Sequence, residues 1–338
     1  MDGNTTVLAF PLRNRTCWRL TVCVVFALFA GGALLISLGI GSVAVSPEEI
    51  LRILRAGLTA DAKSQVIWNI RLPRTLVGAL VGVNLALAGA ILQGVLKNPL
   101  ADPHILGISS GAGLAGVVIL VLYPHLEMLV TPVAFCGAMA AAVLIYLLAW
   151  KNGIQPVRII LAGVAVSALL GAGISGLLVF YSDRVHGALM WLVGGLAARS
   201  WPHLQLILPY TVVGGLLGVL GAGRLNIMAL GDDIARGLGM HVEKTRLLLT
   251  AVAALLAASA VSVAGLLGFV GLIVPHMARV LLGSDHRFLL PASALLGAGV
   301  LTLSDTLART IFSPVELPAG IIMAAFGAPF FLFLLRRA

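Results

Sequence analysis

The chain contains 338 residues, of which 60% are apolar and only 10% are Asp, Glu, Lys or Arg. Soluble domains carry about 25% charged residues, so this composition excludes an ordinary water-soluble globule and a disordered chain. The net charge is +9. Because the basic residues are scattered between apolar runs, they favour charged loops beside a membrane over binding to nucleic acid.

Continuous apolar runs predict an all-α, polytopic membrane protein with about ten transmembrane helices, because each span needs roughly 20 residues. A transmembrane β-barrel would instead show alternating polarity in segments of about ten residues. We expect a tail over 1–17 and a single transmembrane domain over 18–335. In chain order, the predicted spans cover residues 18–40, 74–96, 104–122, 128–150, 158–180, 204–222, 247–264, 266–283, 288–310 and 318–335.

The segments between the spans predict the orientation in the membrane. Most of the 22 Lys and Arg residues face the cytoplasm if the N-terminus lies inside, which follows the positive-inside rule. Both termini are then cytoplasmic, the polar segment 41–73 lies outside and the polar segment 224–246 lies inside. Residues 181–203 contain two tryptophans, which favour the headgroup level, so we expect a short interfacial helix there.

Several short motifs of soluble enzymes occur in the wrong structural context. Residues 111–116 and 171–176 match GxGxxG, but both lie inside apolar helical runs instead of following a strand. Residues 107–111 match GxSxG without a strand-to-helix turn, and residues 57–64 lack the second glycine of a P-loop. The seven His and three Cys residues are dispersed. We therefore predict no catalytic residue, no metal site and no cofactor on this chain.

Two alternative functions need no partner chain. The first is a stand-alone secondary transporter or channel, and the second is a membrane-embedded hydrolase. A transporter driven by an ion gradient needs carboxylates or histidines near the membrane midplane. The span interiors hold mainly Asn84 and Gln93 as larger polar groups. Asp305 and Arg309 lie toward the outer end of the ninth span, four residues apart on one helix face. This scarcity argues against ion-gradient coupling.

Three stretches of the sequence occur together in a specific order. The first contains RLPR (71–74), NPLADP (98–103) and LGISSGAG (106–113), the second is LGDDIARGLG (230–239), and the third joins GLLGFVGLIVPHMAR (265–279) to ELPAG (316–320). Over about residues 46–335, the chain resembles the FecCD-type permeases of ABC importers for iron-siderophores, haem and cobalamin.

The resemblance implies a type II importer permease that moves an iron-siderophore, haem or cobalamin complex across the cytoplasmic membrane of a prokaryote by alternating access. Its implied partners are a second permease subunit, two cytoplasmic ATP-binding subunits that carry ATP-Mg, and an extracytoplasmic binding protein. The chain would be a transport subunit and not an enzyme. The cargo stays open between these classes, and so does the choice between an identical and a related second permease.

The resemblance also implies residues that dock the binding protein. The arginines of RLPR and the arginine before ELP are similar to family residues that receive acidic groups of the binding protein, and they correspond to Arg71, Arg74 and Arg309. Forked guanidinium groups suit bidentate carboxylates. The alternatives are anchoring to lipid headgroups and, for Arg309, neutralisation by Asp305 across one helical turn.

Segment 226–242 resembles the coupling helices that sit in a cleft of the ATPase. Residues 226–230 and 232–238 would form two short helices broken at a glycine, which permits a sharp turn. An aspartate would cap the second helix, and Ala235 with Leu238 would form an apolar face. A solvated loop is the alternative. The expected coupling residues are Leu230, Gly231, Asp232, Asp233, Ala235, Arg236, Leu238 and Gly239.

The family picture places the translocation pathway at the dimer axis, near the fifth and tenth spans. Small residues there would form a weakly binding wall, although the same residues would serve helix packing. Loops 97–103 and 151–157 would close the inner gate. The expected pathway and gate residues are Asn98, Leu100, Pro156, Gly163, Ser167, Gly171, Gly320 and Ala324.

Overall fold

The computed structural model describes residues 15–41, 44–104, 107–151 and 156–337, so most of the predicted tail over 1–17 lies outside the described residues. Within these ranges the chain is built from helices and contains no β-strand, as the composition predicts. Three shorter apolar helices are α5 (Ile108–Leu122), α12 (Val270–Leu282) and α14 (Ala319–Arg337). Seven described helices are long and apolar enough to cross a membrane, namely α1 (Arg15–Gly39), α4 (Leu72–Leu96), α6 (Val130–Ala149), α7 (Pro156–Phe180), α9 (Trp201–Ala229), α11 (Val242–Ala264) and α13 (His286–Ala308).

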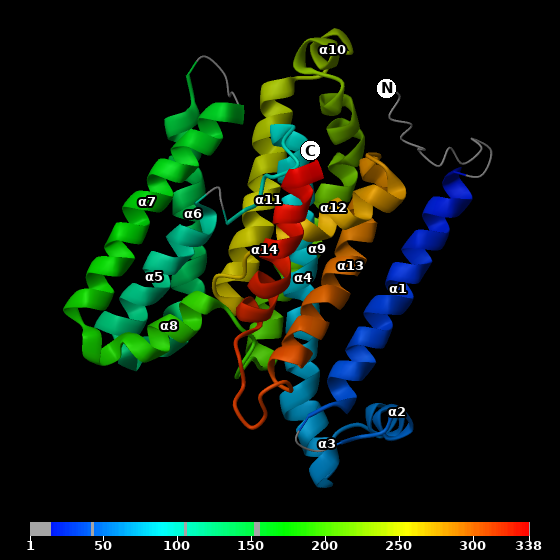
Figure 1. Ribbon diagram of the computed structural model, residues 1–338, viewed down its shortest axis with the longest axis vertical. Coiled ribbons are helices and arrows are strands. Elements are labelled where there is room, and N and C mark those ends of the chain that lie inside the picture. Colours follow the sequence, from blue (N-terminus) through cyan, green and yellow to red (C-terminus); the bar gives the residue numbers. More distant parts are fainter. Residues whose placement is uncertain (1–14, 42–43, 105–106, 152–155, 338) are drawn as a thin grey trace.

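Helix α4 forms the centre of the bundle. It packs against α9, α11, α12 and α13, and most of its residues are buried. Helix α1 lies along the outer side of α13, whereas α5, α6 and α7 form a second group that contacts the bundle mainly through α6 and α11 (Figure 1). Because α4 has neighbours on every side, it has no polar face.

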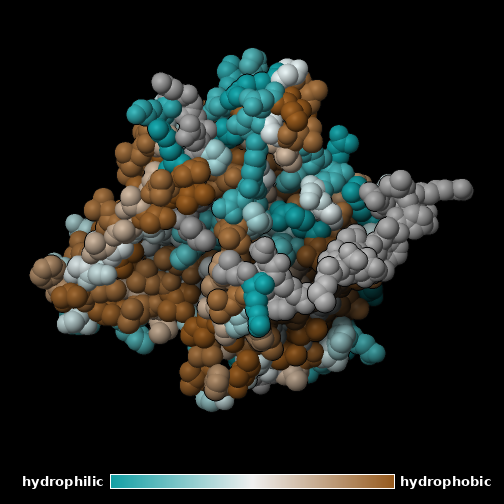
Figure 2. Space-filling view, turned by 45° about the horizontal axis from the view of Figure 1, so that its top comes forward, coloured by the Kyte–Doolittle hydropathy of each residue, from teal (hydrophilic) through white to brown (hydrophobic). Residues whose placement is uncertain are grey.

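The short helices gather at the two ends of the bundle. Helix α10 (Asp232–Gly237) marks the α10 end, at the top of Figure 1, while α2 (Pro47–Ala56), α3 (Ala62–Val66) and η2 (Ile67–Arg71) mark the opposite α2 end. Helix α8 (Val185–Val193) forms within the segment where a short interfacial helix is expected. In Figure 2 hydrophilic residues gather at the α10 end, whereas the flank of α7 is hydrophobic, as a lipid-facing surface requires.

Small residues bring the central helices into backbone contact. A Cβ built on Gly82 of α4 would clash with the carbonyl of Gly297 of α13, and a Cβ on Gly297 would clash with the carbonyl of Gly82. Close approach of this kind is how helices associate in lipid, where burial of apolar side chains gives little driving force. The glycine-rich composition therefore reflects helix packing at this crossing.

Replacing Gly82 by alanine should lower the free energy of unfolding by about 1–3 kcal/mol, because α4 and α13 must separate to admit the methyl group. The measurement is the thermal unfolding midpoint of the purified chain in detergent. Gly223→Ala is the matched control, since a Cβ there has no heavy atom within 4 Å, and alanine favours the helix. Equal midpoints for the two variants would contradict this account of the crossing.

Candidate functional site

Arg74 lies in the first turn of α4 and is bound inside the α2 end. Its Nε donates to Asp305 Oδ2 at 2.9 Å and its second terminal nitrogen to Asp305 Oδ1 at 3.0 Å, which makes a bidentate pair. Its remaining nitrogen donates to Glu316 Oε2 at 2.9 Å. The side chains of Arg74 and Asp305 are only 10% and 4% exposed. Arg74 therefore joins α4 to α13 through Asp305 and to the segment before α14 through Glu316.

The other two predicted docking arginines also turn inward. Arg71 donates to the carbonyl oxygens of Leu38 at 2.8 Å and Gly39 at 3.2 Å, at the end of α1. Arg309 donates to the carbonyl oxygen and the hydroxyl of Ser37. Asp305 forms its ion pair with Arg74 and none with Arg309, so the alternative of direct pairing across one turn of α13 is not what the structure has. Contact between α1 and α13 directs Arg309 across to α1 instead.

Helix α2 presents exposed cations at the same end. A capping box of Ser46 and Glu49 begins α2, and Ile50 and Ile53 are buried. A hydrogen bond from Lys63 lowers the pKa of Glu49 from its ordinary value. The opposite face of α2 carries Arg52 and Arg55, which are exposed. Sequence reasoning did not include these two among the docking residues, although they belong to the basic residues expected outside, and the apolar spacing of α2 indicates that they are exposed.

At the α10 end, Asp232 joins three elements. It accepts from Lys97 Nζ at 2.7 Å, just beyond the end of α4, and from Arg246 of α11 at 2.8 Å. Arg246 is only 1% exposed. Burial raises the pKa of Asp232, but the hydrogen bonds and charges of Lys97 and Arg246 outweigh it and hold this pKa below its ordinary value. These bonds fix α10 to α4 and α11.

Parts of the coupling prediction need correction. Residues 226–230 do not form a separate short helix, because α9 continues through Ala229 and the chain turns only at Gly231, whose φ is +113°. No aspartate side chain caps α10, since Asp232 is bound by Lys97 and Arg246. Ala235 is buried and does not form the exposed apolar face.

The exposed apolar face of the coupling segment is formed by other side chains. Leu230, Ile234 and Leu238 are 57%, 55% and 62% exposed. Ile234 and Leu238 are four residues apart and so lie on one side of α10 and its C-cap, whereas Leu230 ends α9 just before the turn at Gly231. Sequence reasoning named Leu230 and Leu238 but missed Ile234, which the same spacing indicates. Asp233 and Arg236 form an exposed pair at 3.2 Å, and Gly239, with φ of +82°, ends the segment.

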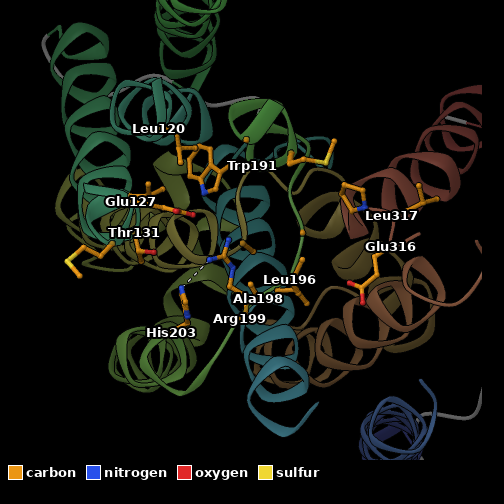
Figure 3. Close-up of a pocket in the computed structure, with 18 residues that line it drawn as sticks. Leu120, Glu127, Thr131, Trp191, Leu196, Ala198, Arg199, His203, Glu316 and Leu317 are labelled. Atoms are coloured by element: carbon orange, nitrogen blue, oxygen red, sulfur yellow. Dashed lines mark hydrogen bonds between the residues drawn. The ribbon is translucent and has the colours of Figure 1, made fainter. Parts of the chain in front are cut away.

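Two cavities lie beside α8. The Arg199 cavity has a volume of about 580 Å³ and lies between α5, η3 (Pro124–Leu129), α8 and residues 195–199 (Figure 3). The α14 cavity has a volume of about 800 Å³ and is lined by α14, the end of α8, residues 266–272 and two side chains of the loop after α4, Asp102 and His104.

A glycine clasp separates the two cavities. It consists of three backbone segments that meet at Gly194, Gly265 and Gly320. Gly195 N donates to Ala264 O at 2.8 Å, and Gly320 N donates to Gly194 O at 3.0 Å. A Cβ on Gly265 would clash with the carbonyl of Trp191, and a Cβ on Gly320 with that of Val193. Residues on one side of the clasp line the Arg199 cavity, and residues on the other line the α14 cavity.

The predicted pathway residues fall into separate places. Gly320 and Ala324 line the α14 cavity. Gly163 and Ser167 of α7 lie against Gly107 at the start of α5, where a Cβ would meet Ser167 Oγ at 3.0 Å and Gly163 O at 3.2 Å. They therefore pack helices within one chain and line neither cavity. Gly171 has open space beside it.

The predicted gate residues lie at the ends of helices. Asn98 accepts a hydrogen bond from Leu100 N at 2.9 Å and so forms the turn after α4. Pro156 begins α7. Residues 152–155 of the second gate loop lie outside the described residues. Among the described residues, no group of three or more His, Cys, Asp or Glu side chains is arranged to hold a metal ion.

Comparison with known proteins gives consistent matches over most of the chain. The model of the FecCD transport family matches residues 27–337. The chain is 43% identical to the Fe(3+)-citrate import system permease protein YfmE of Bacillus subtilis, over 89% of this chain and 90% of the relative. It is 41% identical to the hemin transport system permease protein HmuU of Yersinia pestis, over 90% and 93%.

A solved structure has the same fold. The chain is similar to a metal-chelate type ABC transporter in an inward-facing conformation, with a TM-score of 0.84 and 30% sequence identity. The match covers 94% of this chain and 99% of that chain. The helix order described above is therefore that of an ABC importer permease.

Proposed function

We propose, since this chain belongs to the FecCD transport family, that it is the membrane permease subunit of an ATP-driven importer for a metal chelate. The observation that supports this most directly is α10, a short helix held outside the bundle by Asp232 and presenting Ile234 on an exposed apolar face. A transporter that works alone has no need of such a surface.

The proposed assembly contains a second permease subunit, identical or related, and two ATP-binding subunits at the α10 end. The α10 end faces the cytoplasm in this proposal, together with both termini, and the α2 end faces an extracytoplasmic binding protein. The protein lies in the cytoplasmic (inner) membrane of a prokaryote. In this proposal ATP-Mg binds to the ATPase, and we expect no cofactor, catalytic residue or nucleic-acid site on this chain.

The proposed mechanism is alternating access. Closure of the ATPase pair on ATP moves the coupling segment, and Asp232 transmits this movement to α4 through Lys97 and to α11 through Arg246. Because α4 is the buried centre of the bundle, its displacement reaches every helix packed on it. The loops that begin at Asn98 and end at Pro156 would close the route on the cytoplasmic side.

The proposed cargo is an iron-siderophore, haem or cobalamin complex. Relatives are named for ferric citrate, ferric hydroxamate, haemin and cobalamin, so the family membership supports the class. The α14 cavity has a mainly apolar lining that includes Gly320 and Ala324. Such a lining would bind cargo weakly and so allow its release. On the opposite face, docking of the binding protein would use the α2 end, where Arg71, Arg74 and Arg309 shape the surface and Arg52 is exposed.

The test of the proposed function is purification of the tagged chain from its native membrane in mild detergent, with mass spectrometry of the proteins that remain bound. A stoichiometric ATP-binding subunit is the expected result. A preparation without any ATPase that still transports under an ion gradient in liposomes would overturn the proposal in favour of a stand-alone secondary transporter or channel.

Replacing Ile234 and Leu238 together by glutamate should release the ATPase from the purified complex, because two carboxylates would enter an apolar contact. The measurement is the amount of ATPase recovered per permease after size-exclusion chromatography, and we expect a loss of tenfold or more. Leu216 and Leu220 of α9, also exposed, supply the matched control as serine variants. Normal ATPase recovery with Ile234→Glu and Leu238→Glu would contradict the assignment.

A further inference from the structure

Arg199 occupies the wall of the Arg199 cavity without a carboxylate partner. It lies between α8 and α9, in a turn closed by a hydrogen bond from Arg199 N to Leu196 O at 3.2 Å. Ala198, immediately before it, has a φ of +56°, which L residues rarely adopt. The turn therefore directs Arg199 toward the cavity at a cost in backbone strain.

The guanidinium group of Arg199 is only partly satisfied. One terminal nitrogen donates to His203 Nε2 at 3.1 Å, while the Nε atom is buried and has no hydrogen-bond partner among the described residues. Since a guanidinium can only donate, His203 accepts from it through Nε2. The other ring nitrogen, Nδ1, lies 3.3 Å from the backbone nitrogen of Ser200 and 3.1 Å from its Oγ, which fixes the ring at the start of α9. The histidine orients Arg199 but does not neutralise it.

The carboxylates of the cavity do not form an ion pair with Arg199. Glu316 is bound to Arg74 at 2.9 Å. Glu127 lines the cavity but is exposed and forms no described ion pair. Burial lowers the pKa of Arg199 from its ordinary value, and the charge of Glu127 offsets part of this effect. Figure 3 shows Arg199 between Glu127 and Glu316.

The same cavity has an apolar floor. Trp191 and Leu196 line it and are 8% and 1% exposed, and Ala264 of α11 closes it. A volume of about 580 Å³ falls within the range of small-molecule sites. A ligand that fits this surface carries a carboxylate toward Arg199 and an apolar or metal-bearing body against Trp191.

We propose that the Arg199 cavity is an acceptance site for a carboxylate-bearing metal chelate, with Arg199 binding a carboxylate of the cargo and His203 positioning the guanidinium. The contact to cargo would be made by the terminal nitrogens of the guanidinium group, because Nε is buried, and it would be a charge-assisted hydrogen bond. The glycine clasp lies between residues that line this site and residues that line the α14 cavity. The inference rests on the proposed importer function and narrows its cargo to anionic chelates.

The test uses the complete importer with its binding protein, reconstituted in proteoliposomes. The probes are ferric citrate and haemin, which carry carboxylates, and a neutral ferric trihydroxamate and cobalamin, which present no free carboxylate. Arg199→Gln should lower uptake of the carboxylate probe tenfold or more, whereas Arg199→Lys, which keeps the charge but loses the fork, should lower it less. Stimulation of the ATPase by the binding protein should not change.

Arg184→Gln is the matched control, because Arg184 lies near the same end, donates to Val121 O at 3.0 Å and does not line the cavity. Its uptake should equal that of the unmodified importer. Transport of only the carboxylate-free probes would overturn the inference and leave the importer function intact, as would full uptake by Arg199→Gln. A complex that transports no probe and lacks ATPase stimulation would overturn the importer function itself.

Discussion

Replacing Arg74 by alanine should destabilise the permease by about 3–5 kcal/mol, because it leaves a buried carboxylate without its partner. Asp305 is only 4% exposed, and Arg74 supplies both of its ion-pair contacts. Helices α4 and α13 and the segment before α14 would lose their common cation. The expected result is a large drop in the amount of folded protein recovered from the membrane and a lower thermal unfolding midpoint in detergent.

Two further variants separate this effect from a loss of docking. Glu316→Gln should cost much less, since Glu316 is 48% exposed and water can replace part of its interaction. The exchange of Arg74→Asp with Asp305→Arg should recover part of the lost stability. If Arg74→Ala leaves the unfolding midpoint unchanged and lowers only binding-protein stimulation of the ATPase, Arg74 is a surface docking residue and the buried pair contributes little.

Replacing Asp232 by alanine should uncouple ATP hydrolysis from transport. The substitution removes the carboxylate shared by Lys97 and Arg246 and leaves Arg246, which is 1% exposed, with fewer acceptors. Helix α10 would then still contact the ATPase through Ile234 but would no longer be fixed to α4. We expect uptake per ATP hydrolysed to fall tenfold or more in proteoliposomes, with the ATPase still bound.

Two variants serve as controls for Asp232→Ala, one that keeps the negative charge and one at a distant position. Asp232→Glu keeps the carboxylate and should retain most of the transport, whereas Asp183→Asn, an exposed carboxylate outside the α10 network, should behave as the unmodified chain. The pKa of Asp232 lies below its ordinary value, so its contribution is complete above the unfolded aspartate pKa of about 3.9 and is lost only as pH falls through the lower, folded value. Coupling should therefore be flat from pH 8 to pH 5. Unchanged coupling in Asp232→Ala would remove this network from the mechanism.

The seven long apolar helices and the three shorter ones could be predicted because a membrane span is a local property of composition. About 20 apolar residues in sequence suffice to identify one, whatever they pack against. The ends were less accurate: α9 continues through Ala229 and α11 begins at Val242, each beyond the predicted span. Beyond the apolar run, hydrogen bonds within the helix and packing between α9 and α11 maintain these turns, and hydropathy does not measure either.

The residue roles were harder to predict, since they depend on contacts between distant segments. Helical spacing correctly places Asp305 and Arg309 on one face. It cannot predict the contact with Arg74, which lies 231 residues away in the sequence and forms the ion pair with Asp305. In the same way, Ala235 satisfies the apolar spacing of α10 but is buried. The sequence did not indicate a role for Arg199, because that role depends on the left-handed turn at Ala198 and on the cavity that Arg199 lines.

The glycine clasp has a mechanical consequence. It is a seam held by single backbone hydrogen bonds, whereas Arg74 and Asp232 hold the two ends of the chain through ion pairs. A neutral hydrogen bond contributes about 1 kcal/mol, whereas breaking a buried ion pair costs about 3–5 kcal/mol. We therefore expect the chain to separate at the clasp more readily than at either end. Because the hydrogen bonds of the clasp at Gly194 and Gly320 join backbone atoms, we expect its opening not to depend on the chemistry of the cargo, and selection to rest with the surfaces on either side.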